Sequence, residues 1–426
     1  MPTRPTFSLM PDGTSLIIYV VFAPFAIIFI YGLYLRLRSL GISRLIADGP
    51  GGITGAVRRL ALHALGQRRV AKKPRGWPHL GIFYGFITLL IGTTIVAIDW
   101  DVLRPFGVRI LEGRRYLLFE SIMDLMGAIF VLGLIAALVW RLIRLRDAGL
   151  DQRRIQMQFL WLIVGLLYMG ITGFLLEGLR LAIQPVSWAD WSFIGTRVAH
   201  AANWLELGDG VRLVYVLLWW SHALVAFALI AFLPYSSFLH SVGATLNVMV
   251  HPGLPRTELP TPFDLREVME TGDFDVKVGA KSLMDLDERQ RLALIACTNC
   301  GRCDDDCPAV AMGTELSPRG LVQKLRWKLL AGDVDSDLLA EGDLSSGELW
   351  ACTTCGACVE SCPVLIRPVD YIVPFRRELV TQQKLDKRQT ELLGNLGRSF
   401  NPYGLPPSNR NDLAEDLASK RLKSKV

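Results

Sequence analysis

The chain has 426 residues, a net charge of +6 and 51% hydrophobic residues, and its mean hydropathy of +0.33 excludes an ordinary soluble protein of this length. The positive charge does not require a nucleic-acid partner, because the basic residues flank long apolar runs, where the positive-inside rule accounts for them. We therefore expect a membrane protein that binds no nucleic acid.

Five stretches are apolar and long enough to cross a hydrocarbon core, which takes about 20 helical residues. They are Leu16 to Leu35, Leu80 to Ile98, Leu117 to Trp140, Phe159 to Leu176 and Leu213 to Phe232. The first has no basic leader of typical form and no small-residue cleavage site, so we expect a retained helix and not a signal peptide. Helical patterns in the second half complete the prediction of an all-α protein: a five-helix transmembrane bundle followed by a helical ferredoxin-type domain.

The loops between these stretches predict the orientation of the chain in the cell membrane. Between residues 36 and 75 there are ten basic residues and one acidic residue, and the loop after the third stretch is also basic. The two opposite loops mix basic with acidic residues. By the positive-inside rule the N-terminus should lie outside, and everything after His240 should be cytoplasmic.

The chain is predicted to fall into four parts. Residues 1–245 form the membrane domain, and residues 246–284, which begin with Pro and turn residues, form a linker. Residues 285–390 form a soluble domain that contains every cysteine of the chain. Residues 391–426, rich in Asn, Pro and charge, form a C-terminal tail that is expected to be an extended arm or disordered.

All eight cysteines lie in two runs of identical spacing, and such confinement indicates a site in a reducing compartment and not a disulfide scaffold. The runs are Cys297, Cys300, Cys303, Cys307 and Pro308, then Cys352, Cys355, Cys358, Cys362 and Pro363. This C-x2-C-x2-C-x3-C-P spacing is that of bacterial [4Fe-4S] sites, in which the fourth cysteine of each run ligates the other cluster. We therefore assign one cluster to Cys297, Cys300, Cys303 and Cys362, and the other to Cys352, Cys355, Cys358 and Cys307.

Neighbouring residues bear on this assignment. Gly301 and Gly356 allow the backbone to approach the inorganic sulfide closely. The three acidic residues 304–306 are expected to lower the potential of the first cluster by adding negative charge. The alternative is a pair of zinc knuckles, since C-x2-C also suits zinc, but two complete four-cysteine runs that each end in Pro disfavour it.

The two runs are separated by 44 residues, Pro308 to Ala351, which exceeds the spacing in small ferredoxins. Residues 285 to 375 resemble instead the helical ferredoxin domain of succinate dehydrogenase iron–sulfur subunits and of heterodisulfide reductase subunits.

The six histidines raise the question of haem. They are His63, His79, His200, His222, His240 and His251. A histidine near lipid needs a reason, and beside a cluster domain the natural one is ligation of a b haem by two axial imidazoles. His79 begins the second stretch and His240 ends the fifth on the same side, so these two are expected to share one haem. The alternative for His79 is an interfacial histidine that binds lipid headgroups or backbone.

His222 belongs elsewhere, because it lies eighteen residues before His240, about 27 Å along a straight helix. It is expected in the outer half of the membrane. His63 and His251 are expected to be solvated.

Residues 77–98 and 219–240 resemble the membrane domain of the nitrate reductase gamma subunit and its relatives in heterodisulfide reductase. This resemblance implies five helices and two b haems, with ligand histidines on the second and fifth helices at positions that match His79, His222 and His240. The fourth ligand would fall near Leu89, where this chain has no histidine. The outer haem is therefore in question, and His222 either pairs with His200 or has no haem partner.

Glu177 and Arg180 lie one helical turn apart at the outer end of the fourth stretch. One interpretation is a helix-end ion pair. The other is a site beside a quinone, whose proton they would pass, because intramembrane carboxylates often mark proton routes. Asp124, within the third stretch, poses the same question.

The whole combination resembles fused membrane iron–sulfur oxidoreductases of the heterodisulfide-reductase-related group, including those proposed to join electron-transferring flavoprotein or other dehydrogenases to menaquinone. The resemblance implies an oxidoreductase, or a subunit of one, that moves electrons between a cytoplasmic partner and quinone through two clusters and haem b. No acid, base or nucleophile of the chain is needed, because the cofactors carry the chemistry. Many of these proteins continue into cysteine-rich CCG domains. No cysteine follows Cys362 here, so the expected soluble partner is a flavoprotein or a separate CCG-domain subunit.

Two other functions stay open at this point. The chain could be a non-catalytic membrane anchor that conducts electrons within a larger complex. The missing histidine near Leu89 favours this interpretation. A redox sensor would carry a recognisable output domain, and the sequence shows none.

Overall fold

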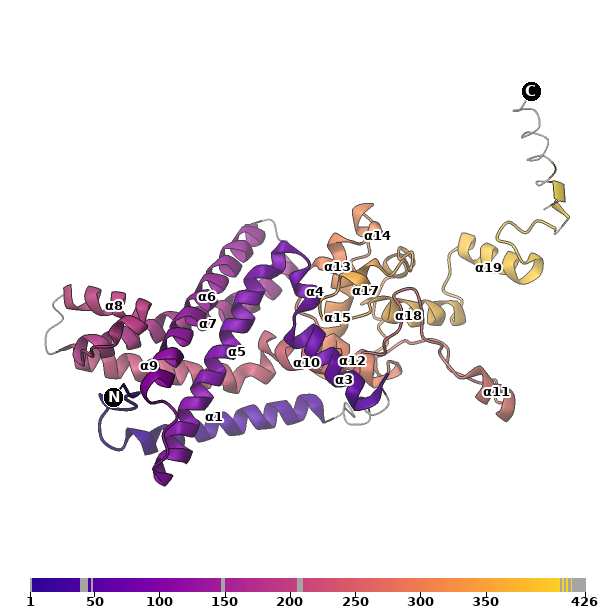
Figure 1. The fold of residues 1–426 in the computed structure, drawn as a ribbon. Helices are drawn as coiled ribbons and strands as arrows, with labels where there is room; N and C mark the ends of the chain where they lie inside the picture. The colour runs from indigo at the N-terminus through magenta and orange to yellow at the C-terminus, as the bar shows by residue number, and fades with distance from the viewer. Residues whose placement is uncertain are drawn as a thin grey trace.

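The computed structural model describes residues 2–38, 45–46, 49–146, 150–204, 210–406, 408–409, 411–412 and 415. Within these residues the fold is helical, and the only β-type pairing is an isolated bridge between Thr3 and Glu112. The predicted all-α fold class is confirmed. Figure 1 shows a bundle of long helices on one side and a group of short helices on the other.

Five helices of the described chain are long and apolar enough to cross a membrane, as the sequence predicted. They are α1 (Thr14–Leu37), α5 (Trp77–Ala97), α6 (Gly113–Arg146), α7 (Leu150–Ile183) and α9 (Val211–Phe232). Large apolar side chains stand exposed on their outer faces, among them Leu16, Leu132 and Trp161 at 66 to 70% of their surface. Such faces are stable in lipid and not in water. The protein is therefore a multi-pass membrane protein.

The helices pack in the order α5 on α6, α6 on α7, α7 on α9, and α9 on α1. Glycine allows the closest of these approaches, since a side-chain carbon at Gly85 of α5 would lie 2.6 Å from Phe130 of α6. Phe130 and Leu134 lie in the small core between these helices. A short amphipathic helix, α8 (Phe193–Trp204), packs on α7.

The fifth span ends at Phe232, as predicted, but His240 does not belong to its helix. Helix α9 stops at Phe232, two 3-10 turns follow (Leu233–Tyr235 and Ser237–Leu239), and His240 begins a new helix, α10 (His240–Val250). The break falls at Pro234, which has no N–H to continue the helix. The expectation that His240 ends the fifth helix is therefore wrong, and the straight-helix estimate of its distance from His222 does not apply.

The cysteine-rich domain is built from short helices with side-chain caps. They are α12 (Glu288–Ala296), α13 (Arg302–Asp305), α14 (Pro308–Ala311), α15 (Pro318–Ala331), α16 (Ser346–Trp350), α17 (Ala357–Ser361) and α18 (Val369–Thr381). Asp287 and Ser317 accept hydrogen bonds from the first turns of α12 and α15, which is the usual way to satisfy the free N–H groups of a helix start. Leu294, Leu321 and Phe375 lie at the centre of its apolar core.

This domain is joined to one end of the membrane bundle by direct contacts. Helix α10 packs on α12 and on the loop helix α3 (Gly52–Arg59), as Figure 1 shows. Arg36 donates to the carbonyl of Leu330 at 3.0 Å, and Asn247 donates to the carbonyl of Val364 at 2.7 Å. The domain is therefore docked on the bundle and not merely tethered to it.

The linker and the tail differ from their expected forms. His251 is half-buried: its Nδ1 accepts from the N–H of Gly253 at 3.0 Å, and burial, with Arg367 nearby, lowers its pKa to about 4. The expectation that His251 is solvated is therefore wrong. His63 is also half-buried, with an Nδ1 atom that has no hydrogen-bond partner.

The linker holds a helix, α11 (Leu265–Thr271). The tail begins within another, α19 (Lys387–Ser399), so it is not simply extended. The last part of the predicted arm, residues 407, 410, 413–414 and 416–426, lies outside the described residues.

Candidate metal centres

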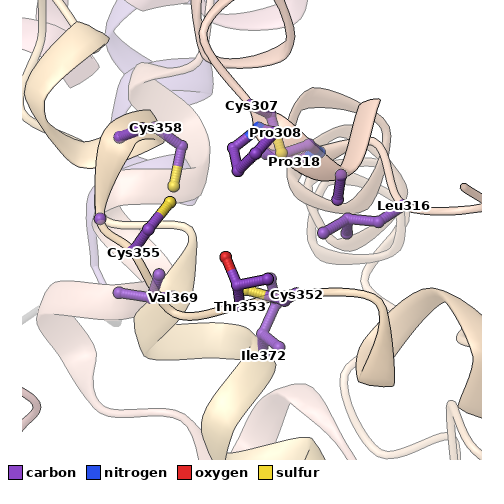
Figure 2. A pocket seen from close by; sticks show the side chains of 13 residues that line it. Cys307, Pro308, Leu316, Pro318, Cys352, Thr353, Cys355, Cys358, Val369 and Ile372 are labelled. Atoms are coloured by element: carbon purple, nitrogen blue, oxygen red, sulfur yellow. The ribbon is translucent and has the colours of Figure 1, made fainter. Parts of the chain in front are cut away.

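Four cysteines surround one cavity in the soluble domain. Cys307, Cys352, Cys355 and Cys358 line a space of about 310 Å³, part of it open to solvent, and Figure 2 shows their side chains around it. Cys307 comes from the first run, just before α14, and the other three come from the second run. The fold thus brings the fourth cysteine of one run to the first three of the other.

A second cavity has the complementary set. Cys297, Cys300, Cys303 and Cys362 line a space of about 390 Å³, also partly open to solvent, with Arg302 and Arg319 among its other lining residues. The two groups are those expected from the spacing, with the fourth cysteines exchanged. Their ligation of two [4Fe-4S] clusters stays a prediction.

The backbone around each cavity is shaped in the same way. Asn299 and Thr354 have φ of 55° and 54°, and Gly301 and Gly356 have φ of 83° and 70°. Positive φ turns each loop tightly, and glycine adopts it at no steric cost. In both loops the backbone N–H two residues after the first cysteine donates to its sulfur, at 3.3 Å from Thr354 to Cys352 and likewise from Asn299 to Cys297. Such bonds stabilise a thiolate.

One buried thiol beside each cavity, Cys358 in the first and Cys362 in the second, needs a positive partner before it can ionise. Burial raises the pKa of Cys358 and of Cys362 to about 12. A coordinating metal deprotonates a thiol outright. The iron of a cluster would supply this positive charge, so both cavities suit an iron–sulfur cluster.

One side chain supports that fit directly. Arg326 of α15 is 4% exposed, and its Nε has no hydrogen-bond partner. Its guanidinium interacts electrostatically with the sulfur of Cys297, and Gln323, one turn earlier, donates to that sulfur at 3.0 Å. A buried cation with an unused donor beside four thiols suits an anionic cluster with thiolate ligands.

The three aspartates beside the first run are each paired with a cation. Asp304 pairs with Arg319 at 2.9 Å, Asp305 with Arg75 at 2.5 Å and Asp306 with Lys73 at 2.7 Å. Their negative charge is offset, which removes the reason to expect a lowered cluster potential. Arg75 and Lys73 belong to the loop before α5, so two of the pairs join the cysteine-rich domain to the membrane domain.

His79 and His240 lie at the end of the bundle where this domain docks. The two imidazoles are close enough to interact electrostatically. His79 is exposed near the start of α5 and stacks on Phe83. His240 is half-buried, and its Nδ1 lies 2.6 Å from the carbonyl of Ser237. A proton donated from Nδ1 to that carbonyl leaves Nε2 as the coordinating atom.

His222 lies apart from this pair, on α9. Its Nδ1 is 2.7 Å from the hydroxyl of Thr172 on α7. No described contact joins it to His200, which is exposed on α8. Leu89, at the position of the fourth family histidine, packs on the apolar core around Phe130.

The ion pair of Glu177 and Arg180 is part of a larger buried network. Arg180 donates through Nε to Glu177 at 3.2 Å and through a terminal nitrogen to Glu120 of α6 at 3.2 Å. Tyr116 donates to Glu120 at 2.6 Å, and Arg4 lies 3.7 Å from it. Sequence reasoning missed Glu120, Tyr116 and Arg4. The i, i+4 spacing of Tyr116 and Glu120 on an apolar helix was the available signal.

Removing the central cation of this network should destabilise the membrane domain. In Arg180→Ala two carboxylates are left buried without their shared partner, a loss of about 3–5 kcal/mol for a buried pair. We expect a clearly lower melting temperature in detergent. Arg180→Lys should recover most of it. Arg109→Ala breaks the exposed pair with Glu112 and should cost about 0–1 kcal/mol. Equal effects of the two alanine variants would contradict a buried structural network.

Asp124 has a structural role. Its carboxylate accepts from the backbone N–H of Ile194 at 2.7 Å, in the first turn of α8, and it is 5% exposed. It thus caps that helix from a neighbouring span. This contact accounts for the buried carboxylate without a proton route.

Comparison with known proteins agrees with this architecture. Residues 296–366 match the model of the 4Fe-4S dicluster domain, so the cysteine-rich segment is an iron–sulfur domain. The chain is 26% identical over 429 residues to the EtfAB:quinone oxidoreductase of Syntrophomonas wolfei, covering 91% of this chain and 58% of that protein. No solved structure matched.

Two further relatives belong to heterodisulfide reductases. A component of the dihydromethanophenazine:CoB–CoM heterodisulfide reductase of Methanosarcina acetivorans is 26% identical over 204 residues, 46% of this chain and 66% of that component. An iron–sulfur component of the CoB–CoM heterodisulfide reductase of Methanopyrus kandleri is 34% identical over 90 residues, 21% of this chain and 41% of that component. The chain spans somewhat over half the length of the quinone oxidoreductase above.

Proposed function

Because the chain is related to the membrane iron–sulfur oxidoreductases of the heterodisulfide reductase group, as its sequence led us to expect, we propose that it carries electrons between a cytoplasmic redox partner and the quinone pool. The route would be two [4Fe-4S] clusters and a b haem held by His79 and His240. The matched domain and the relatives support the most general part of this proposal, that the chain is an iron–sulfur electron-transfer protein in the membrane.

The observation that carries the proposal is the position of the cysteine cavities. Each cavity is lined by four cysteines, and the domain that holds them is docked on the end of the bundle that carries His79 and His240, which are close enough to interact electrostatically. A route from a water-soluble partner to a membrane carrier needs redox centres on both sides of that junction. The clusters and the haem supply one-electron chemistry when bound, and the protein positions and tunes them.

The basic loop supports a cytoplasmic position for the domain. Lys73 and Arg75, which belong to the strongly basic segment before α5, pair with Asp306 and Asp305 of the cysteine-rich domain. That domain therefore lies on the same side of the membrane as the basic loop, and basic loops are preferentially cytoplasmic.

The names of the relatives guide the choice of partner and carrier. The Syntrophomonas relative is an EtfAB:quinone oxidoreductase, so a flavoprotein donor and a quinone such as menaquinone are the partners we propose here. A CCG-domain protein, as in heterodisulfide reductases, is the alternative soluble partner. Electron flow in either direction uses the same parts.

A second function is favoured by one observation. Leu89 packs in the bundle core where the related membrane domains carry a haem histidine, so the outer haem lacks a ligand. A chain without haem would act as a membrane anchor that wires a larger complex, with quinone chemistry in a neighbouring protein.

The deciding experiment is a redox difference spectrum of the purified chain together with iron analysis. The relay predicts about eight cluster irons and a b-type haem that both dithionite and a menaquinol analogue reduce. Reducible clusters without any haem signal would favour the anchor. Bound zinc in place of iron would exclude both.

A further inference from the structure

The two cysteine cavities differ in what surrounds them. The cavity of Cys297, Cys300, Cys303 and Cys362, here called the inner cavity, faces the membrane domain. Arg302 at its edge donates to the carbonyls of Arg69 and Val70 at 3.2 and 3.4 Å. Those two residues lie in the loop that leads to α5 and His79.

A second contact holds the inner cavity from the same side. Arg69 donates to the carbonyls of Val359 and Cys362 at 3.1 and 3.2 Å. Cys362 is the cysteine that the second run contributes to this cavity. Both runs are thus fixed to the membrane loop at the inner cavity.

A third connection leads from the inner cavity to His240. Arg326, buried on α15, interacts electrostatically with Cys297 on one side and with His240 on the other. Helix α12, which ends at Cys297, packs on α10, which begins at His240, and on α15. The inner cavity and the proposed haem ligand His240 therefore lie on helices that pack directly on each other.

The cavity of Cys307, Cys352, Cys355 and Cys358, here called the outer cavity, reaches the protein surface at one cysteine. Cys355 is the one exposed cysteine of the eight, all of which the structure describes. A charged side chain beside Cys352 is Arg376 of the same domain, which donates to the carbonyls of Leu349, at 2.8 Å, and of Cys352. The backbone of Arg256, in the linker, passes over Gly356.

We propose that the two clusters act in a fixed order: the outer cluster, reached at Cys355, exchanges electrons with the soluble partner, and the inner cluster exchanges them with the membrane domain. This inference rests on the proposed function and adds to it the docking position of the partner. Electron tunnelling falls steeply with distance, so a redox protein whose cofactor lies near its own surface would have to approach the Cys355 face.

The same geometry assigns a positioning role to Arg326. A buried guanidinium beside Cys297 stabilises the more negative, reduced form of the inner cluster and raises its potential. Gln323 acts in the same direction through its hydrogen bond to the sulfur. Arg376 should raise the potential of the outer cluster in the same way. Removing one of these two cations should therefore lower the potential of one cluster and identify its signal.

The test uses the full chain in lipid nanodiscs, with both clusters reduced by dithionite and observed by electron paramagnetic resonance. Arg326→Gln should shift the midpoint potential of one signal downward, and Arg376→Gln should shift the other. A water-soluble dysprosium–EDTA complex should then speed the relaxation of the signal that Arg376→Gln shifts, and leave the signal that Arg326→Gln shifts unchanged.

Controls keep the assignment secure. Gln323→Leu should shift the same signal as Arg326→Gln. If the Arg326→Gln variant does not fold, Gln323→Leu takes its place in the test. Arg326→Lys keeps the charge and should keep the potential, and Arg388→Gln, exposed on α19, should shift neither signal.

Relaxation of the Arg326-linked signal, or of both signals alike, would overturn the order. The absence of both cluster signals would instead overturn the proposed function, whereas loss of haem alone leaves this test valid.

Discussion

Replacing Cys362 with alanine should remove the same cluster as replacing Cys300, although the two cysteines lie in different runs. Cys362 lines the inner cavity with Cys300, while the other three cysteines of its own run line the outer one. A buried cluster that loses one of four thiolates is left with an open iron site. We expect the iron content to fall from about eight to about four per chain, with one of two resonance signals lost.

The reciprocal pair provides the control. Cys307→Ala should remove the same signal as Cys355→Ala and spare the one that Cys362→Ala removes. If instead Cys362→Ala and Cys355→Ala abolish the same signal, each run holds its own cluster, and the exchange of fourth cysteines is wrong. Mass spectrometry and detergent gel filtration would establish that each variant is intact.

Replacing His79 or His240 with alanine should abolish the b-type haem and leave both clusters in place. The two imidazoles interact electrostatically at the end of the bundle where the cysteine-rich domain docks, and the hydrogen bond at Nδ1 of His240 leaves Nε2 to coordinate. A haem iron with one axial imidazole loses its low-spin spectrum. We expect no dithionite-reduced b band in either variant, with unchanged cluster resonance and iron content after correction for haem.

His222→Ala is the matched control, because this histidine also lies on the bundle but bonds to Thr172, away from the pair. The His222→Ala variant should keep the haem of His79 and His240. Haem that persists in His79→Ala would refute that ligand, and haem lost only in His222→Ala would move the site to the outer half of the membrane.

Much of this molecule follows from local patterns. The five spans depend on runs of apolar residues, and the grouping of the cysteines depends on the known behaviour of the repeated run, so both could be expected before the fold was known. The break at Pro234 is also a local event. The predicted apolar stretch already stopped at Phe232, and His240 was placed on the same helix without regard to Pro234, which cannot donate the backbone hydrogen bond that would continue it.

The features that could not be predicted are contacts between distant segments. Sequence alone places Arg326 on an amphipathic helix, and only the packing of α15 against α12 buries it beside Cys297. The partners of Asp305 and Asp306 lie some 230 residues earlier in the chain. Glu120 likewise depends on Arg180 from the next span. No spacing rule links such residues, because their pairing is decided by tertiary packing.

The exchange of the fourth cysteines bears on how the protein is assembled in the cell. If each cluster takes three ligands from one run and the fourth from the other, neither cluster can be completed until the ribosome has made both runs. By then all five membrane spans have been synthesised. Each completed cluster would also join two remote stretches of polypeptide, as a cross-link does. Maturation of the metal centres and closure of the domain should thus be a single late event.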